Sequence, residues 1–305
     1  MPLREPNLIS HDLYVWHPFP ALRGLLLNPD TPLKKGGTNR VSFCSEIEYY
    51  VAYLVTMSAP KAPSTASSSL QNSERAYTMT SGETTIREYL ERLGARESVP
   101  GGGGASALAG AYGVSLGMMV CEFTIGKKKY AEAEPRIRAI EARLGKLRES
   151  FLQLSDEDEK VFLPLSQAYG LPEGTPEEKD FKETTLETCL SNASMTPIKV
   201  MERACEALDY LSELEAHGSK LMQSDVGVAA SYLSTAIEGA VMNVYINTKM
   251  MKNQNRMIEL CEYAQKLLMD GRAKSRLIYE AVEDKVKPPY DPELDRIARN
   301  KVDFS

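Results

Sequence analysis

Four consecutive glycines occupy residues 101–104 and lead directly into a run of alanine, glycine and serine that starts at Ala105. Such small residues predict a helix that its neighbours approach closely. The first N–H groups of a helix have no intrahelical partner and carry partial positive charge, and glycine leaves them open because it has no Cβ. These residues therefore predict a loop that offers backbone N–H groups to a ligand. The alternative is a turn whose glycines only allow tight packing.

Two familiar glycine motifs for nucleotide binding do not fit this loop. A P-loop closes with Gly-Lys-Ser or Gly-Lys-Thr, and no such tripeptide follows. The dinucleotide pattern G-x-G-x-x-A fits at Gly102, Gly104 and Ala107, but it must follow a buried strand, and residues 91–97 are polar. The loop is therefore not expected to bind a nucleotide.

Two further groups of polar residues are candidates for ligand contacts. Asn243 and Asn247 lie four residues apart among apolar neighbours, so they share one helix face, and their amides need hydrogen-bond partners. An amide network between helices is the alternative for this pair. Three lysines at residues 127–129 follow the small-residue helix. They are candidates for binding carboxylates or for proton transfer, although the helix dipole favours cations there in any case.

The elements that must position these residues are predicted to be helices. Apolar periodicity and the placing of proline and glycine predict helices at about residues 84–94, 104–125, 133–153, 155–170, 175–192, 196–217, 225–252 and 254–285. Ser155, with Asp158 as its capping-box partner, is expected to begin the fourth of these. We therefore predict an all-α protein, an antiparallel helical bundle with long central helices, preceded by an irregular N-terminal extension.

The chain changes character near residue 79. Residues 59–69 are rich in alanine, proline and serine, which is typical of a linker. We predict a helical domain at residues 79–305 and an N-terminal extension at residues 1–78. The extension is expected to be poorly structured or to result from a mis-assigned start, with Met79 as the true start.

Composition excludes several classes of partner. Hydrophobic residues make up 43% of the chain and charged residues 26%, which is ordinary for a globular protein. A net charge of -6 gives no basic surface, so no nucleic-acid partner is expected. Residues 100–121 carry no charge, but alanine, glycine and serine dominate them and Glu122 follows. A buried central helix is therefore predicted, and no membrane span.

The cysteines indicate a reducing compartment, and the spacing of the histidines argues against a histidine-based metal site. The five cysteines are widely spaced and form no C-x-x-C motif. They are expected to be reduced, which predicts a cytoplasmic protein. No two of the three histidines have helical ligand spacing, so no metal site is expected.

Spaced motifs along the helical part carry a family resemblance. They are residues 100–103 with 109–111, 123–130 (FTIGKKKY), 154–158 with Phe162, 171–172 (LP) with 175–179 (TPEEK), Ser224 with Asp225, and 243–247 (NVYIN). In this order they resemble the cyclodeaminase/cyclohydrolase family, found as the C-terminal half of formiminotransferase-cyclodeaminase and as stand-alone bacterial proteins. The resemblance runs from Thr84 to the last helix and includes none of residues 1–78.

The resemblance implies an enzyme of folate one-carbon metabolism. The first expectation is formimidoyltetrahydrofolate cyclodeaminase, which converts 5-formiminotetrahydrofolate to 5,10-methenyltetrahydrofolate and ammonia. The second is 5,10-methenyltetrahydrofolate cyclohydrolase, which gives 10-formyltetrahydrofolate, and a third is a non-catalytic helical module for folate binding or oligomerisation. A homodimer is implied. No bound cofactor is expected, because the tetrahydrofolate derivative is the substrate and neither reaction changes oxidation state.

The resemblance also implies site residues, placed where the glycine loop meets the helices that carry the carboxylates and the asparagine pair. The candidate catalytic residues are Asp158, Glu202, Asp225 and Lys127. The candidate substrate-binding residues are Gly101, Gly102, Gly103, Gly104, Lys128, Asn243 and Asn247.

Each carboxylate also has a simpler interpretation. Asp158 would complete the Ser155 capping box, Asp225 would cap the following helix, and Glu202 would be a solvated charge. Gly104 stands where the family's motif often has serine. A hydroxyl at this position is therefore lost unless Ser106 supplies it.

Overall fold

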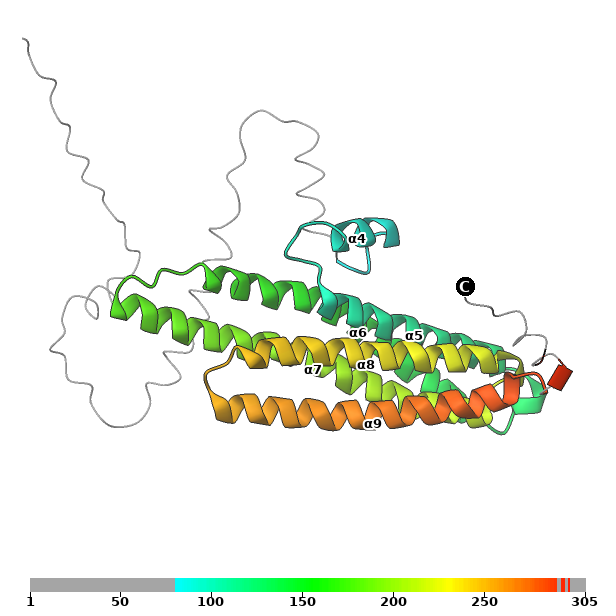
Figure 1. Ribbon diagram of the computed structural model, residues 1–305. Coiled ribbons are helices and arrows are strands. Elements are labelled where there is room, and N and C mark those ends of the chain that lie inside the picture. Colours follow the sequence, from blue (N-terminus) through cyan, green and yellow to red (C-terminus); the bar gives the residue numbers. More distant parts are fainter. Residues whose placement is uncertain (1–79, 290–291, 294–295, 297–305) are drawn as a thin grey trace, which may run out of the picture. The chain divides into compact units, whose positions relative to one another are not determined.

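Long helices lie side by side in the part of the chain that the structure describes (Figure 1). The computed structural model describes residues 80–289, 292–293 and 296, and the predictions for residues 1–78 and Met79 fall outside them. The long helices are α5 (Gly102–Thr124), α6 (Glu134–Tyr169), α7 (Pro176–His217), α8 (Gln223–Lys249) and α9 (Gln254–Val286). No strand occurs among the described residues, so the predicted all-α bundle is confirmed.

The small-residue helix α5 packs closely against α6 and α8. Its glycines leave room for large side chains of its neighbours. A Cβ added to Gly110 would lie 2.4 Å from Cε1 of Phe151 on α6, and one added to Gly113 would lie 2.9 Å from Cγ of Leu233 on α8. Phe151 and Leu233 are both fully buried. Glycine at these positions therefore lets α5 approach both neighbours, as its composition predicted.

The length and apolar composition of α5 are also those of a membrane span, and α5 is the one such helix among the described residues. Half of its most apolar stretch is buried inside the bundle. Contacts with α6 and α8 account for this burial. The packing is that of a core helix, in agreement with the expectation of a buried central helix.

Two predicted helix boundaries are wrong, because α6 and α7 are each continuous where the sequence indicated a break. No helix begins at Ser155, which is buried inside α6, so the capping box expected between Ser155 and Asp158 does not form. Pro197 lies buried within α7. Proline removes one backbone hydrogen bond, but α7 packs against α6, α8 and α9 along its length. Tertiary packing therefore outweighs the local break signals.

A short helix, α4 (Ile86–Leu93), precedes the bundle and begins with a capping box. The Thr85 hydroxyl accepts a hydrogen bond from the Glu88 N–H at 3.2 Å, and the Glu88 carboxylate accepts one from the Thr85 N–H at 3.0 Å. Figure 1 shows α4 beside the long helices, apart from their packed core. Tyr89 is its one buried residue. Polar contacts and a single buried ring therefore hold α4 in place.

Candidate functional site

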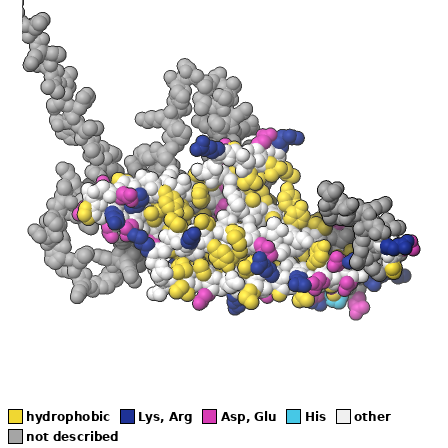
Figure 2. Space-filling model, viewed as in Figure 1, with side chains coloured by type: hydrophobic (Ala, Val, Ile, Leu, Met, Phe, Trp, Pro, Cys, Tyr) yellow, Lys and Arg dark blue, Asp and Glu magenta, His cyan; other side chains and the backbone are white. Residues whose placement is uncertain are grey.

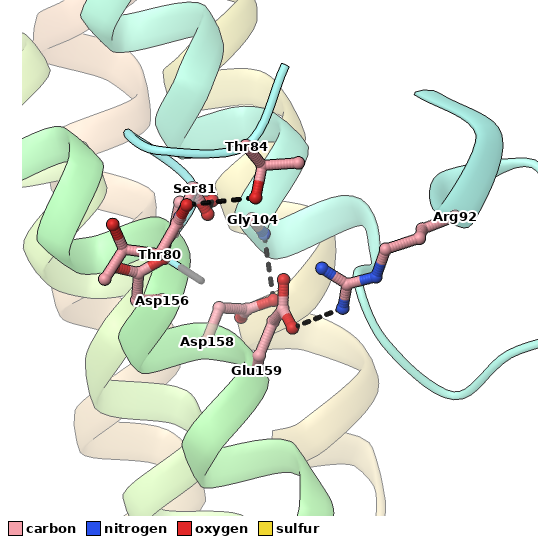
Figure 3. Close-up of polar contacts among 9 residues, drawn as sticks. Thr80, Ser81, Thr84, Arg92, Gly104, Asp156, Asp158 and Glu159 are labelled. Carbon is pink, nitrogen blue, oxygen red and sulfur yellow. Dashed lines mark hydrogen bonds and ion pairs between the residues drawn. The ribbon is translucent and has the colours of Figure 1, made fainter. Parts of the chain in front are cut away.

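The N-terminus of α5 faces a carboxylate on α6. The Gly104 N–H donates a hydrogen bond to Oδ2 of Asp158 at 2.8 Å, as Figure 3 shows. A Cβ added to Gly103 would lie 2.1 Å from Oδ1 of Asp158. The carboxylate therefore occupies the space that any side chain at residue 103 would need. This contact gives the glycine loop a chemical partner 54 residues away in the sequence.

Burial against α5 changes the acidity of Asp158. The pKa of this carboxyl is raised to about 6: burial raises it most, the Gly104 N–H opposes the shift, and the negative charge of Glu159 adds to it. Both protonation states are therefore accessible near neutral pH. A carboxyl poised in this way can accept a proton from one substrate atom and return it to another.

Of the two asparagines, Asn243 lies beside the N-terminal end of α5. A Cβ on Gly102 would lie 3.6 Å from Nδ2 of Asn243, so Asn243 borders the glycine loop. The Asn243 amide donates a hydrogen bond to the Gly239 carbonyl oxygen of its own helix at 3.0 Å. Asn247 follows one turn later on α8 and is half-buried. The structure thus brings Asn243 together with Asp158 and the glycines.

Ser106 does not supply the hydroxyl that Gly104 lacks. The Ser106 hydroxyl donates a hydrogen bond to the Gly102 carbonyl oxygen at 2.7 Å, within α5. Its oxygen also lies against α8, where a Cβ on Gly239 would approach it to 2.3 Å. Ser106 therefore joins α5 to α8 and is not directed at Asp158.

Lys127, Lys128 and Asp225 lie at the opposite end of the α5–α8 pair. The 23 residues of α5 separate the lysines from the glycine loop by roughly 33 Å. The two lysines are exposed, whereas Asp225 is half-buried in the first turn of α8. Asp225 does not cap that helix, which has Met222 at its N-cap position. Within one chain these residues do not share a site with Asp158.

Glu202 lies between α7 and α9. Its Oε1 accepts a hydrogen bond from the Tyr263 hydroxyl at 2.7 Å. This bond raises the pKa of Tyr263. Glu202 is therefore paired with a residue of α9, whereas the glycine loop contacts α6 and α8. The predicted single site is thus divided within one chain.

Sequence reasoning missed the contribution of the segment that carries α4. The Ser81 N–H donates a hydrogen bond to Oδ1 of Asp156 at 2.7 Å, and Arg92 forms an ion pair with Glu159 at 2.9 Å. Figure 3 shows the Arg92–Glu159 pair on one side of Asp158 and the residues Ser81 and Asp156 on the other. Apolar periodicity predicted a helix at about residues 84–94 but not where it would dock. The described residues contain no cluster of three or more histidine, cysteine or acidic side chains able to hold a metal ion.

Comparison with known proteins gives the family. The model of the formiminotransferase-cyclodeaminase family matches residues 85–266, which include the glycine loop, Asp158 and the asparagine pair. The chain belongs to this family. The membership predicted from the spaced motifs is thereby confirmed.

Relatives of this cyclodeaminase-family protein carry two names. It is 33% identical over 205 residues to methenyltetrahydrofolate cyclohydrolase of Methylorubrum extorquens, covering 67% of this chain and 99% of that protein. It is 29% identical over 201 residues to formimidoyltransferase-cyclodeaminase of Mus musculus, covering 66% of this chain and 37% of the mouse protein. The chain thus matches little more than a third of the mouse protein.

A solved structure supports the fold. The crystal structure of formiminotetrahydrofolate cyclodeaminase from Thermotoga maritima superposes with a TM-score of 0.58 at 24% identity, covering 68% of this chain and 97% of that one. The similarity shows that the helical bundle is shared.

Proposed function

We propose that this protein catalyses a one-carbon reaction on tetrahydrofolate, with Asp158 as general acid and base. The first candidate is cyclodeamination of 5-formiminotetrahydrofolate to 5,10-methenyltetrahydrofolate and ammonia. One observation carries the proposal: the Asp158 carboxyl lies at the N-terminus of α5, and its pKa is raised by burial to about 6. The family and the names of the relatives supply the substrate class.

Cyclodeamination needs protons moved between nitrogens. N10 attacks the formimino carbon on N5, and the tetrahedral adduct then expels ammonia. N10 must lose a proton, and the departing nitrogen must gain one. A carboxyl with a pKa near 6 can accept the first proton as a carboxylate and deliver the second as an acid. Asn243 and the N–H groups at the start of α5 would bind polar atoms of the pterin ring beside it.

Cyclohydrolysis of 5,10-methenyltetrahydrofolate is the second candidate. Water attacks the methenyl carbon, and the ring opens to 10-formyltetrahydrofolate. The relative named methenyltetrahydrofolate cyclohydrolase favours this reaction, because the alignment includes 99% of that protein. Asp158 would take a proton from the attacking water and return it to the nitrogen that leaves. Neither reaction changes oxidation state, so we propose that no redox cofactor is bound.

The proposed assembly is a homodimer that pairs through α5 and α8. Large apolar side chains on these helices are exposed, among them Tyr112, Phe123, Tyr232 and Met242. The rings of Tyr112 and Tyr232 lie 5.7 Å apart near the middle of the two helices. Figure 2 shows hydrophobic side chains gathered over α5 and α8. A second copy would remove this surface from water.

An antiparallel dimer would also reunite the divided candidate residues. Lys127 and Asp225 lie at one end of the α5–α8 pair, and Asp158 lies at the other. Two copies related by a two-fold axis near Tyr112 would place each end of one copy beside the opposite end of its partner. We propose that the folate site is shared between subunits in this way. We also propose a cytoplasmic location, because Cys121, Cys189 and Cys205 are buried and form no disulfide.

Two assays test the proposed function. The purified protein is given 5-formiminotetrahydrofolate, and separately 5,10-methenyltetrahydrofolate, while the methenyl absorbance is followed. A rise with the first substrate supports the deaminase, and an enzyme-dependent loss with the second supports the hydrolase. Absence of both effects would contradict the proposal and leave a non-catalytic folate-binding or oligomerisation module.

A further inference from the structure

The hydroxyl of Tyr89 lies beside the glycine loop and has no hydrogen-bond partner among the described residues. Its side chain is 5% exposed, and its oxygen is buried with no partner at hydrogen-bonding geometry among the described residues. Buried hydroxyls are almost always hydrogen-bonded, because an unpaired one loses its water without compensation. Phenylalanine would fill the same space without this cost. The hydroxyl therefore calls for a reason beyond packing.

The position of this hydroxyl is defined by Gly104. A Cβ added to Gly104 would lie 3.1 Å from the Tyr89 oxygen and 3.3 Å from Oγ of Ser155. The Ser155 hydroxyl is already paired with that of Ser81 at 3.0 Å. The Tyr89 oxygen thus lies where a side chain at residue 104 would extend. Gly104 itself holds Asp158 through its N–H group, so hydroxyl and carboxylate border the same glycine.

The Tyr89 hydroxyl is suited to donate a hydrogen bond. Burial raises the pKa of Tyr89, the nearby Ser155 hydroxyl lowers it, and the negative charges of Glu159 and Asp158 raise it again, so that the net shift is upward. The phenol therefore stays protonated at neutral pH and keeps its proton for a hydrogen bond. The proton on this oxygen has no acceptor of suitable geometry among the described residues. A bound ligand would provide one.

We propose that Tyr89 is a substrate-binding residue whose hydroxyl donates a hydrogen bond to the nitrogen or oxygen on the one-carbon unit, beside Asp158. This role rests on the proposed folate reaction. It provides the hydroxyl function that Gly104 lacks and that Ser106, bonded within α5, does not supply. Two residues from different elements, Tyr89 of α4 and Asp158 of α6, would then hold the reacting group between them.

Access to the hydroxyl requires a small movement of α4. The segment is attached through the Arg92–Glu159 ion pair and the contacts of Ser81 with α6. Tyr89 is the one buried residue of α4, so a shift of this helix uncovers little apolar surface. These polar contacts are part-buried, and water that enters beside the moving helix can replace them. The substrate would thus enter beside α4 and meet the hydroxyl as α4 closes.

The decisive variant is Tyr89→Phe, which removes only the oxygen. We expect kcat to fall about tenfold on the substrate that the wild type turns over, as for one lost hydrogen bond. We also expect the melting temperature to stay the same or rise, because an unpaired buried hydroxyl is removed. A purely structural hydroxyl predicts the reverse, a lower melting temperature with unchanged kcat, and that result would overturn the proposal.

A second variant tests the position of the hydroxyl. Gly104→Ser alone places Cβ 3.1 Å from the Tyr89 oxygen, so activity should fall. In Tyr89→Phe/Gly104→Ser that oxygen is gone, and the serine hydroxyl occupies the same space. We expect the double variant to be at least severalfold more active than Tyr89→Phe. Tyr210→Phe is the matched control, because it loses only a part-buried bond to Glu206 within α7, away from the glycine loop, and should keep wild-type kcat.

Measurements of folate binding distinguish a wrong role for Tyr89 from a wrong proposed function. Wild type and Tyr89→Phe are titrated with tetrahydrofolate and with 5-formyltetrahydrofolate by calorimetry. If the wild type is inactive but binds 5-formyltetrahydrofolate about tenfold more tightly than Tyr89→Phe, with equal affinities for tetrahydrofolate, the reaction is wrong and the Tyr89 role stands. If the wild type is active and Tyr89→Phe matches it in kcat and affinity, the role is overturned and the function stands. A wild type that neither binds nor reacts overturns both.

Discussion

At the scale of single residues, Asp158 and the glycines of the loop depend on one another. The carboxylate fits against α5 because residue 103 has no side chain, and the Gly104 N–H holds it there. The same closeness removes water from the carboxyl and raises its pKa to about 6. A feature that destabilises the charged carboxylate thus prepares it for proton transfer.

Asp158→Asn should remove activity and stabilise the fold above pH 6. The folded protein holds a proton on Asp158 up to about pH 6, whereas the unfolded chain loses it near pH 4. The stability of the wild type therefore falls as pH rises through this window, by up to about 3 kcal/mol, and asparagine avoids this loss. Its oxygen can still accept the Gly104 N–H.

Urea unfolding at about pH 4 and about pH 8 measures this difference. The variant should gain stability relative to wild type only at the higher pH, while turnover falls about 100-fold or more. Glu157→Gln is the control, because it loses an exposed ion pair with Lys199 while its amide oxygen can still accept the Thr196 hydroxyl, so stability should change little at either pH. A variant less stable than wild type at about pH 8 would refute the assignment of a buried charge to Asp158.

Gly103→Ala should displace the Asp158 carboxylate. Its Cβ would lie 2.1 Å from Oδ1, so the carboxyl must leave its place and lose the Gly104 N–H bond. We expect turnover to fall about 100-fold, since misplacement of a reacting group by 1 Å has effects of this size. The pH–rate profile should also lose its inflection near pH 6. A retained inflection with near wild-type turnover would mean that Asp158 is not the proton-transfer group.

At the scale of elements, the small residues of α5 determine how closely the bundle packs. Gly110 admits Phe151 of α6, and Gly113 admits Leu233 of α8. The helix that carries the binding loop is therefore held from two sides. This rigidity keeps the N–H groups of the loop at a fixed distance from Asp158 and Asn243.

Gly110→Ala and Gly145→Ala should have opposite effects on stability. Alanine at residue 110 would press into the ring of Phe151 and cost about 1–3 kcal/mol of unfolding free energy. Alanine at residue 145, inside α6, meets only Cε of Met118 at 3.7 Å and should add up to about 1 kcal/mol through helix propensity. Urea unfolding of both variants measures the difference. Equal effects would show that α5 is not tightly packed against α6.

At the scale of the whole molecule, Glu202 lies apart, paired with Tyr263 of α9, and the other candidate residues form two groups at the two ends of the α5–α8 pair. Asp158, Asn243 and the glycines lie at one end of the α5–α8 pair, and Lys127 and Asp225 lie at the other. The apolar surface between the two groups is centred on Tyr112 and Tyr232. This arrangement is the reason for proposing a site shared between two subunits.

Mixed dimers test the shared site. Asp158→Asn and Asp225→Asn chains with different tags are co-expressed, and the mixed species is purified. Each parent should fold but lose most turnover, whereas the mixed dimer contains one site with both wild-type residues and should recover about half of wild-type activity. Sedimentation gives the oligomeric state. A monomeric wild type, or a mixed dimer as inactive as its parents, would contradict sharing.

Much of the fold could be predicted from the chain alone. Apolar periodicity and glycine and proline signals predicted α5, α8 and α9 within a few residues, because each is set by local pattern and marked ends. The breaks predicted before Ser155 and between residues 192 and 196 were wrong. Local signals of this kind are weak where a helix is packed along its length, as α6 and α7 are.

The sequence by itself determined the family, the helical elements and the glycine loop, since these follow from local spacing and ordered motifs. Only the tertiary structure decided which carboxylate meets that loop. Asp158 lies 54 residues from Gly104 in the chain, and its raised pKa comes from burial that no local pattern records. The same holds for the Tyr89 hydroxyl and for the separation of Lys127 from Asp158. The removal of water from a side chain and the distance between two residues depend on how the helices pack, so they are set only once the helices are assembled.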